Sequence, residues 1–285
     1  MSTGIKELNY NIFDPTGNIT ALVESPVSVV DQPGTAAEIM RLHPEVEQVG
    51  FVRLTESPDS AVHAVLRMAG GEFCGNATMC TAALYMLRRG LDGSAEIKVS
   101  VSGATEPLPV SLIRKDEISF DSSVLMPPAL GIEETVFGCD TDEGTISGTL
   151  PVVHMEGIDH IVIGPDSAFY ALKDDPEHAG RVIRKWCGRL CSDCLGMMFL
   201  EGEGQARRLV PLVYVPGADT VFWENSCASG SAAVGMYLAS GSGEAVDCTL
   251  NEPAGVLRVE SDAQNGGIRL SGRVILKLTH AADKC

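Results

Sequence analysis

Two helix starts, each led by a cysteine, set the strongest limit on the fold of this chain. One is "EFCGNATMC" at residues 72–80, and the other is "NSCASGSAA" at residues 225–233. Each motif runs into a segment that is apolar on nearly every side, at residues 77–87 and 230–239. A helix on a protein surface has one apolar stripe, so we expect each of these helices to lie inside its own domain, wrapped by strands.

The two motifs also follow one spacing, because Cys227 lies 153 residues after Cys74. Identity between the two copies is weak, but the order of residue types recurs: cysteine, small, polar, small, hydroxyl. The spacing predicts that the chain repeats one structural unit. The aligned pairs after the cysteines are Gly75 with Ala228, Asn76 with Ser229 and Thr78 with Ser231.

Most of the remaining segments are short and β-branched or aromatic, with Gly, Pro, Asp and Ser between them, which predicts strands. A chain of 285 residues is long enough for two mid-sized domains. We expect an N-terminal domain over residues 1–122 plus 275–285 and a C-terminal domain over 123–274. The predicted strands are 5–13, 18–24, 48–54, 61–68, 95–101, 149–154, 159–163, 196–200, 207–215 and 256–260, and the predicted helices are 34–43, one from 75, 176–192 and 228–240.

Composition argues against several classes of protein. The formal charge is -17 and the 21 basic residues are scattered, which disfavours binding to nucleic acid. No run of about 18 apolar residues and no export signal is visible, so we expect a cytoplasmic, soluble protein that does not bind a membrane. The nine cysteines are an odd number, which favours reduced thiols over a disulfide framework.

The two helix starts suggest a specific chemistry. The first turn of a helix carries unbonded N–H groups and a partial positive charge, which stabilise a bound carboxylate and lower a cysteine pKa that starts at about 8.5. Two such sites facing each other across a cleft would offer one carboxylate cradle and two thiols. One thiolate could remove a proton from carbon while the opposite thiol returns one. This arrangement is a two-base racemase, and it needs neither a cofactor nor a metal.

Four motifs resemble those of the diaminopimelate epimerases and occur in the same order. They are "PTGNITALV" at 15–23, "EQVGFV" at 47–52, "FCGNATMC" at 73–80 and "CASGSAA" at 227–233. The resemblance implies an α+β protein of two pseudo-symmetric domains, each a β-barrel-like sheet around a central apolar helix. It also implies racemisation without pyridoxal phosphate, in a cleft between the domains.

The resemblance assigns roles to individual residues. Cys74 and Cys227 become the acid/base pair, whereas Cys80 is expected to be a packing residue inside the helix. The pocket-lining side chains are Asn18, Gln48 and Asn76, and the backbone N–H groups expected to receive the substrate carboxylate are those of Gly75, Asn76, Ala228 and Ser229.

The substrate implied by that family does not fit this sequence well. The places where diaminopimelate epimerases bind the far end of their substrate read "RMAGGEF" (67–73), "GIDH" (157–160), "LGMMF" (195–199) and "WENS" (223–226), and none supplies the expected residue. Glu224 is either the family's ammonium-binding glutamate in a shorter loop or a different residue in its place.

A closer resemblance is to the histidine racemases of opine-metallophore biosynthesis. It rests on "GEFCGNATM" (71–79), "VEQVGF" (46–51), "LGMM" (195–198) and "WENSCASGSA" (223–232). In that light Glu47 pairs with an imidazole and Trp223 stacks on it; the alternatives are a surface carboxylate and a core aromatic. The expected reaction converts L-histidine to D-histidine, and the alternative substrate is diaminopimelate or another amino acid. A homodimer is the expected oligomer.

Other readings of the cysteines and histidines remain open. Cys187, Cys191 and Cys194 have an iron–sulfur spacing, but they continue an apolar stripe of the predicted helix 176–192, so we interpret them as buried. The histidines show no zinc-ligand spacing and are interpreted as structural. A non-catalytic amino-acid-binding protein would be separated from an enzyme by exchange of the α-hydrogen in deuterated water.

Overall fold

The computed structural model describes residues 7–57, 59–141, 144–243, 245–261 and 267–282. The chain divides into unit 1, made of Met1–Leu125 and Ser271–Cys285, and unit 2, made of Met126–Leu270. The boundaries expected after residues 122 and 274 lie inside strands β7 (Ser119–Leu125) and β16 (Ile268–His280). Residues 5–6 of the strand expected at 5–13, and parts of both expected domains, lie outside the described residues.

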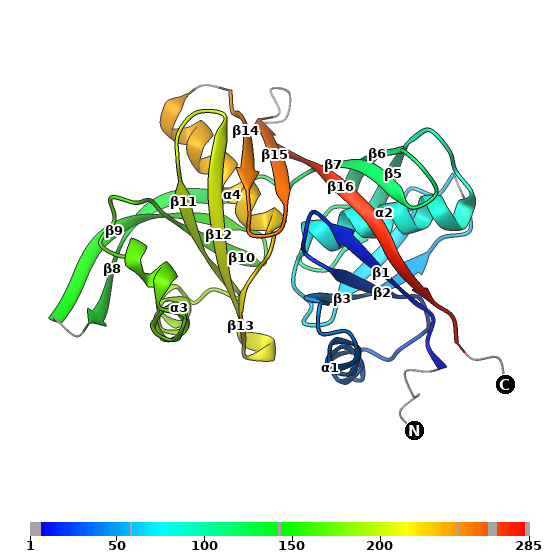
Figure 1. Ribbon diagram of the computed structural model, residues 1–285, viewed down its shortest axis with the longest axis horizontal. Coiled ribbons are helices and arrows are strands. Elements are labelled where there is room, and N and C mark those ends of the chain that lie inside the picture. The colour runs from blue at the N-terminus through cyan, green and yellow to red at the C-terminus, as the bar shows by residue number, and fades with distance from the viewer. Residues whose placement is uncertain (1–6, 58, 142–143, 244, 262–266, 283–285) are drawn as a thin grey trace. The chain divides into compact units, whose positions relative to one another are not determined.

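Unit 1 is a closed sheet. Seven strands neighbour one another in chain order, and β16 pairs with both β7 and β1, so the last strand joins the first (Figure 1). The six strands that precede β7 are β1 (Tyr10–Pro15), β2 (Thr20–Val23), β3 (Gln48–Leu54), β4 (Ala64–Met68), β5 (Ser94–Val101) and β6 (Leu108–Arg114).

Helix α2 (Gly75–Arg89) packs against each of the strands β1 to β7. Every residue from Gly75 to Met86 is buried, as the absence of a polar face in this segment requires. The helix ends at Gly90, whose φ of 61° is the left-handed conformation that glycine adopts without strain. The shorter α1 (Gln32–Leu42) packs against β3 and buries Ile39 in a separate cluster with residues of β1 and β2.

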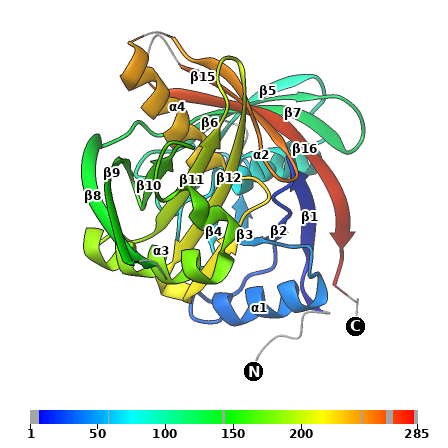
Figure 2. The same cartoon turned by 60° about the vertical axis from the view of Figure 1, so that its left-hand side comes forward.

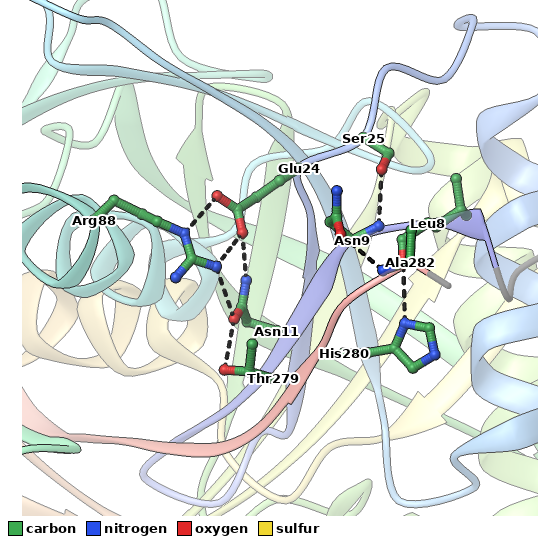
Figure 3. A network of polar contacts seen from close by, with 9 residues as sticks. All are labelled: Leu8, Asn9, Asn11, Glu24, Ser25, Arg88, Thr279, His280 and Ala282. Carbon is green, nitrogen blue, oxygen red and sulfur yellow. Dashed lines mark hydrogen bonds and ion pairs between the residues drawn. The ribbon is translucent and has the colours of Figure 1, made fainter. Parts of the chain in front are cut away.

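A polar network fixes the C-terminal end of α2 to the sheet of unit 1 (Figure 3). The Arg88 guanidinium donates to both carboxylate oxygens of Glu24, at 2.9 and 2.6 Å. Asn11 of β1 donates to the same carboxylate at 2.7 Å and accepts from the Thr279 hydroxyl of β16 at 3.0 Å. Because this network lies at the last turn, it anchors the end of α2 opposite to the one at which Cys74 lies.

Unit 2 contains a mixed sheet. Its strands lie in the order β8, β9, β10, β11, β12, β14, β15. Strand β13 pairs with the part of β12 that β14 does not pair with. The pairs β10–β11 and β12–β14 are parallel. The strand bounds are β8 (Gly131–Thr141), β9 (Gly144–Met155), β10 (Ile158–Ile163), β11 (Leu195–Glu201), β12 (Ala206–Val215), β13 (Thr220–Trp223), β14 (Asp247–Asn251) and β15 (Val256–Ser261).

Two helices of unit 2 cover different faces of this sheet, and both can be followed in Figure 2. Helix α3 (Pro176–Leu190) packs on β11 and β12, in a cluster that includes Met197. Helix α4 (Ala228–Ser242) packs on β9, β10, β11 and β15, where a Cβ on Gly230 would meet the Met198 sulfur. Because successive side chains of a strand point to opposite faces, Met197 and Met198 mark the α3 face and the α4 face.

The helix expected at 176–192 ends earlier than its apolar stripe predicts. Cys191 follows the last turn with φ 57° and is exposed, and Cys194 lies buried ahead of β11, outside the helix. The interpretation of the three cysteines as buried is therefore confirmed for Cys187 and Cys194 and wrong for Cys191, whereas only Cys187 lies within the helix. No helix in the described ranges is long and apolar enough to cross a membrane.

Candidate active site

Cys74 is the N-cap residue of α2. Its backbone is extended, with φ −141° and ψ 108°, and its sulfur accepts a hydrogen bond from the Ala77 N–H at 3.4 Å. The Cys74 carbonyl accepts from the N–H and the hydroxyl of Thr78, at 3.0 and 2.8 Å. The sulfur therefore lies over the first turn of the helix, where the unbonded N–H groups carry their partial positive charge.

A tight loop holds the segment in front of Cys74. The Ser102 hydroxyl donates to the Glu72 carbonyl at 2.8 Å. Gly103 follows with φ 76°, and a Cβ at this position would lie 2.5 Å from the Phe73 nitrogen. Only glycine combines the left-handed backbone with so close an approach, so residues 102–103 fix the entry of the chain into α2.

Cys227 has the same structural position in unit 2 as Cys74 has in unit 1. It is the N-cap of α4, with φ −124° and ψ 102°, and its sulfur accepts from the Gly230 N–H at 3.4 Å. Both helices have 15 residues, and α4 ends at Gly243 with φ 66°, as α2 ends at Gly90. The spacing of 153 residues therefore relates both ends of the two helices, and the predicted helix starts at residues 75 and 228 are correct.

The four residues expected to receive a carboxylate through their backbone occupy the first two positions of the helices. Gly75 and Asn76 open α2, and Ala228 and Ser229 open α4. Their N–H groups precede the first hydrogen bond within each helix, which is where an anion is best stabilised. All four residues are buried or nearly so.

Three predicted pocket residues of unit 1 come together at the start of β2 and β3. The Asn18 amide donates to the Glu47 carboxylate at 3.2 Å, and the N–H groups of Glu47 and Gln48 point at the Ile19 carbonyl, at 2.8 and 3.2 Å. Asn18 is 1% exposed, and its amide oxygen has no hydrogen-bond partner among the described residues. A buried, unsatisfied acceptor is costly, which favours a ligand donor at this place.

Two buried carboxyl groups lie close to Cys227. Burial, the Glu224 carboxylate and the Glu252 carboxyl, in that order, raise the pKa of the Cys227 thiol well above its ordinary value. Glu224 is only 7% exposed, and its N–H donates to the Pro211 carbonyl at 3.1 Å. These contacts favour the protonated form of Cys227, which counters the effect of its place at the helix start.

Glu252 was missed by sequence reasoning. It follows β14, and its carboxyl group accepts from the Cys227 N–H at 2.5 Å and bonds the Ser231 hydroxyl. Burial raises its pKa to about 8, with a further contribution from Glu224. Its segment, "NEPAG", has the composition of a loop, and no local pattern indicates a partner 25 residues away.

The structure does not bring Trp223 to the helix start of α4. Its ring stacks on Phe199 at a centroid distance of 5.8 Å and belongs to the cluster beneath α3. Its cross-strand neighbour is Leu212, which lies in the same cluster. Trp223 thus lies on the α3 face of the sheet, whereas α4 with Cys227 covers the other face.

His160 is the most deeply buried histidine of the described chain. It is 0% exposed, and neither ring nitrogen has a hydrogen-bond partner in the part of the chain that the structure describes. Burial lowers its pKa to about 3. The ring fits because residue 196 on the neighbouring strand is glycine: a Cβ there would lie 2.3 Å from Nδ1.

The fold is similar to those of three solved structures described as racemases or epimerases. A predicted epimerase from Pseudomonas aeruginosa superimposes with a TM-score of 0.66 at 16% identity, over 98% of this chain and 100% of that chain. A hydroxyproline epimerase from Agrobacterium vitis, solved with bound trans-4-hydroxy-L-proline, gives 0.63 at 13% identity, over 97% of this chain and 92% of that chain. A probable proline racemase from Agrobacterium radiobacter gives 0.63 at 14% identity, over 95% and 92%.

Sequence comparison identifies the family within this class. The family described as "Histidine racemase CntK N-terminal domain" matches residues 7–276. A histidine racemase from Fusobacterium nucleatum is 29% identical over 248 residues, 84% of this chain and 83% of that protein. The Staphylococcus aureus histidine racemase is 29% identical over 257 residues, 89% and 88% respectively. The chain belongs to the histidine racemase family, and it is an isomerase.

Proposed function

We propose that this protein interconverts L- and D-histidine by a two-base mechanism in which Cys74 and Cys227 are the acid and the base. The observation that carries the proposal is that both cysteines cap a buried 15-residue helix in the same way, each sulfur 3.4 Å from the N–H three residues on. Membership of the histidine racemase family supports histidine as the substrate.

In this mechanism one cysteine removes the α-hydrogen as a thiolate, and the other donates a proton to the opposite side of the carbon. The proton taken and the proton given balance, but the protonation of the pair is then reversed. This reversed form acts on D-histidine, so the two thiols must exchange protons with solvent before another L-histidine can react. The two thiols therefore titrate as a coupled unit. No cofactor takes part in this scheme, so the chain itself must stabilise the developing negative charge.

The helix starts supply that stabilisation. We place the histidine carboxylate on the backbone N–H groups of Gly75, Asn76, Ala228 and Ser229, as expected from the sequence. Charge that develops on the carboxylate as the α-proton leaves is stabilised by these fixed dipoles. Such dipoles need no reorganisation during the reaction, and they are most effective where water is excluded.

The remaining polar groups of histidine are assigned by charge. Asn18, Glu47 and Gln48 form one cluster in unit 1, and its acceptors suit the imidazole N–H or the α-ammonium group. Glu224 is the second candidate for the ammonium group. For Trp223 we favour the core-aromatic interpretation, because its ring packs on Phe199.

We further propose that units 1 and 2 are pseudo-symmetric halves, each with its sheet around one central helix. The matched lengths and caps of α2 and α4 support this arrangement. A cytoplasmic location, a homodimer and a role in supplying D-histidine for a metallophore remain part of the proposal.

The test is α-hydrogen exchange in deuterated water, followed by NMR and chiral chromatography. L-histidine should form D-histidine that carries deuterium, whereas diaminopimelate, proline and other basic amino acids should react more slowly. Cys74→Ser and Cys227→Ser should each abolish racemisation, while the surface control Cys191→Ser should retain it. Near wild-type racemisation by Cys74→Ser or Cys227→Ser would disprove the two-base assignment. Binding of histidine without any exchange would favour an amino-acid-binding protein.

A further inference from the structure

Glu252 joins two separate points of the first turn of α4. One carboxyl oxygen accepts from the Cys227 N–H, at 2.5 Å, and the other bonds the Ser231 hydroxyl. The Ser226 hydroxyl is a further hydrogen-bond partner. The backbone beyond Glu252 is tied to the same turn, because the Ala254 N–H donates to the Asn225 carbonyl at 3.1 Å. The loop after β14 thus supports the segment that carries the second cysteine.

The surroundings of Glu252 offer it little compensation for a negative charge. The side chain is 8% exposed, and its partners are two hydroxyl groups and one backbone N–H. The titratable groups that face it are the Cys227 thiol at the start of α4 and Glu224 of the segment after β13, and Glu224 raises the pKa of Glu252 further. Burial beside another acid favours the neutral form of such a group.

The corresponding turn of α2 is built differently. Thr78 occupies the position that Ser231 has in α4, but its hydroxyl donates to the Cys74 carbonyl at 2.8 Å. Ser231 instead bonds the Glu252 carboxyl. The repeat therefore preserves the hydroxyl residue and gives it a different partner in each helix start.

We propose that Glu252 is a positioning residue for Cys227 and that it works as the neutral acid. As a neutral group it holds the Cys227 backbone without cancelling the partial positive charge of the α4 start. As a carboxylate it would oppose both the substrate carboxylate and the Cys227 thiolate. The inference rests on the proposed two-cysteine function. It adds that Glu252 must be protonated for Cys227, at the start of α4, to act.

The activity test compares pH profiles of kcat/KM for histidine in the wild type, Glu252→Gln and Glu252→Ala. Glutamine keeps the shape of the glutamate side chain and cannot ionise. Glu252→Gln should therefore retain kcat/KM near pH 7 within about threefold, and the pH at which its kcat/KM declines should be higher than in the wild type. This shift of the pH profile should reach about one pH unit, because ionisation of Glu252 no longer contributes.

Glu252→Ala should lose kcat at every pH, by about tenfold or more, because Cys227 is no longer held in place. Glu203→Gln, an exposed carboxylate of the same unit, is the matched control and should follow the wild type.

A second measurement does not depend on activity. A carboxyl whose pKa is raised by folding stabilises the protein fully below the pKa of the unfolded state, and this contribution is lost as pH rises towards about 8. As pH rises from about 5 to 8, the free energy of unfolding of the wild type should therefore decrease relative to that of Glu252→Gln. The midpoints of denaturant unfolding curves measure this difference.

Two results would overturn the proposal: identical pH profiles of kcat/KM for the wild type and Glu252→Gln, or a stability difference between them that does not change with pH. Failure of the two-cysteine function would appear separately, as racemisation by Cys74→Ser. That outcome would leave the stability comparison intact as a test of the neutral acid.

Discussion

Cys74 and Cys227 are N-caps of two helices of equal length, and each sulfur accepts the backbone N–H three residues further on, at 3.4 Å. Their environments differ. Cys74 is partly exposed, whereas Cys227 is 4% exposed and lies against Glu224. One local geometry is thus combined with two degrees of burial, and the carboxyl groups beside Cys227 yield specific predictions.

The thiol of Cys227 should be unreactive near neutral pH and should become reactive when a nearby charge is removed. Burial and the Glu224 carboxylate raise the pKa of Cys227, so Glu224→Gln should lower it and raise the alkylation rate of this residue at pH 8. A decrease of one pKa unit gives about a tenfold faster reaction. Iodoacetamide labelling followed by peptide mass spectrometry measures each cysteine separately, and Cys191 is the exposed internal control. An unchanged Cys227 rate in Glu224→Gln would refute the electrostatic account.

Gly103→Ala should destabilise unit 1 and reduce racemisation. A Cβ at Gly103 would lie 2.5 Å from the Phe73 nitrogen, and the φ of 76° is itself unfavourable for alanine. Together these effects should cost about 2–4 kcal/mol in the free energy of unfolding. Gly93→Ala is the matched control, since Gly93 has φ 71° with open space around it, and it should cost about 1 kcal/mol. Equal losses in the two variants, measured by urea denaturation, would mean that the contact with Phe73 contributes nothing.

His160 should make the protein sensitive to acid. Its pKa is lowered by burial to about 3, below the ordinary value of 6.5, so its contribution to stability is complete above pH 6.5 and is lost as pH falls towards 3. The loss approaches about 1.4 kcal/mol per pH unit within this window. His160→Met should flatten that slope, whereas His178→Gln, on the partly exposed surface of α3, should leave it unchanged. Equal slopes for His160→Met and the wild type would show that His160 does not remain neutral in the folded protein.

Trp223→Phe should affect stability more than substrate binding. The indole packs on Phe199 within the α3 cluster, so loss of part of this ring should cost about 1–2 kcal/mol in the free energy of unfolding. The KM for histidine should stay within about twofold of the wild type, because the ring lies on the face of the sheet away from α4. A tenfold higher KM at unchanged stability would instead support stacking of Trp223 on the substrate.

Much of the framework could be predicted from the sequence. The predicted strands at 48–54, 159–163 and 207–215 match β3, β10 and β12 within one residue, and the two cysteine-capped helices begin where expected. The unpredicted strands include β8, an edge strand with an exposed face, and β16, which is shared between the two units. The sequence of β8 lacks the dense apolar pattern that indicates a buried strand, whereas β16 carries the apolar residues Val274, Ile275 and Leu276 and was missed by sequence reasoning.

Local sequence patterns were sufficient for the parts of the site that depend on neighbouring residues. Capping and the burial of an apolar helix follow from local patterns, so the spacing was enough to place Cys74 and Cys227 at matching helix starts. Three features required the three-dimensional fold: the carboxyl of Glu252 beside Cys227, the buried ring of His160 beside Gly196, and the face of the sheet on which Trp223 lies. These features depend on burial and on contacts between distant segments. The protonation state of a buried group, and therefore its chemistry, is set by those contacts rather than by the residues next to it in the chain.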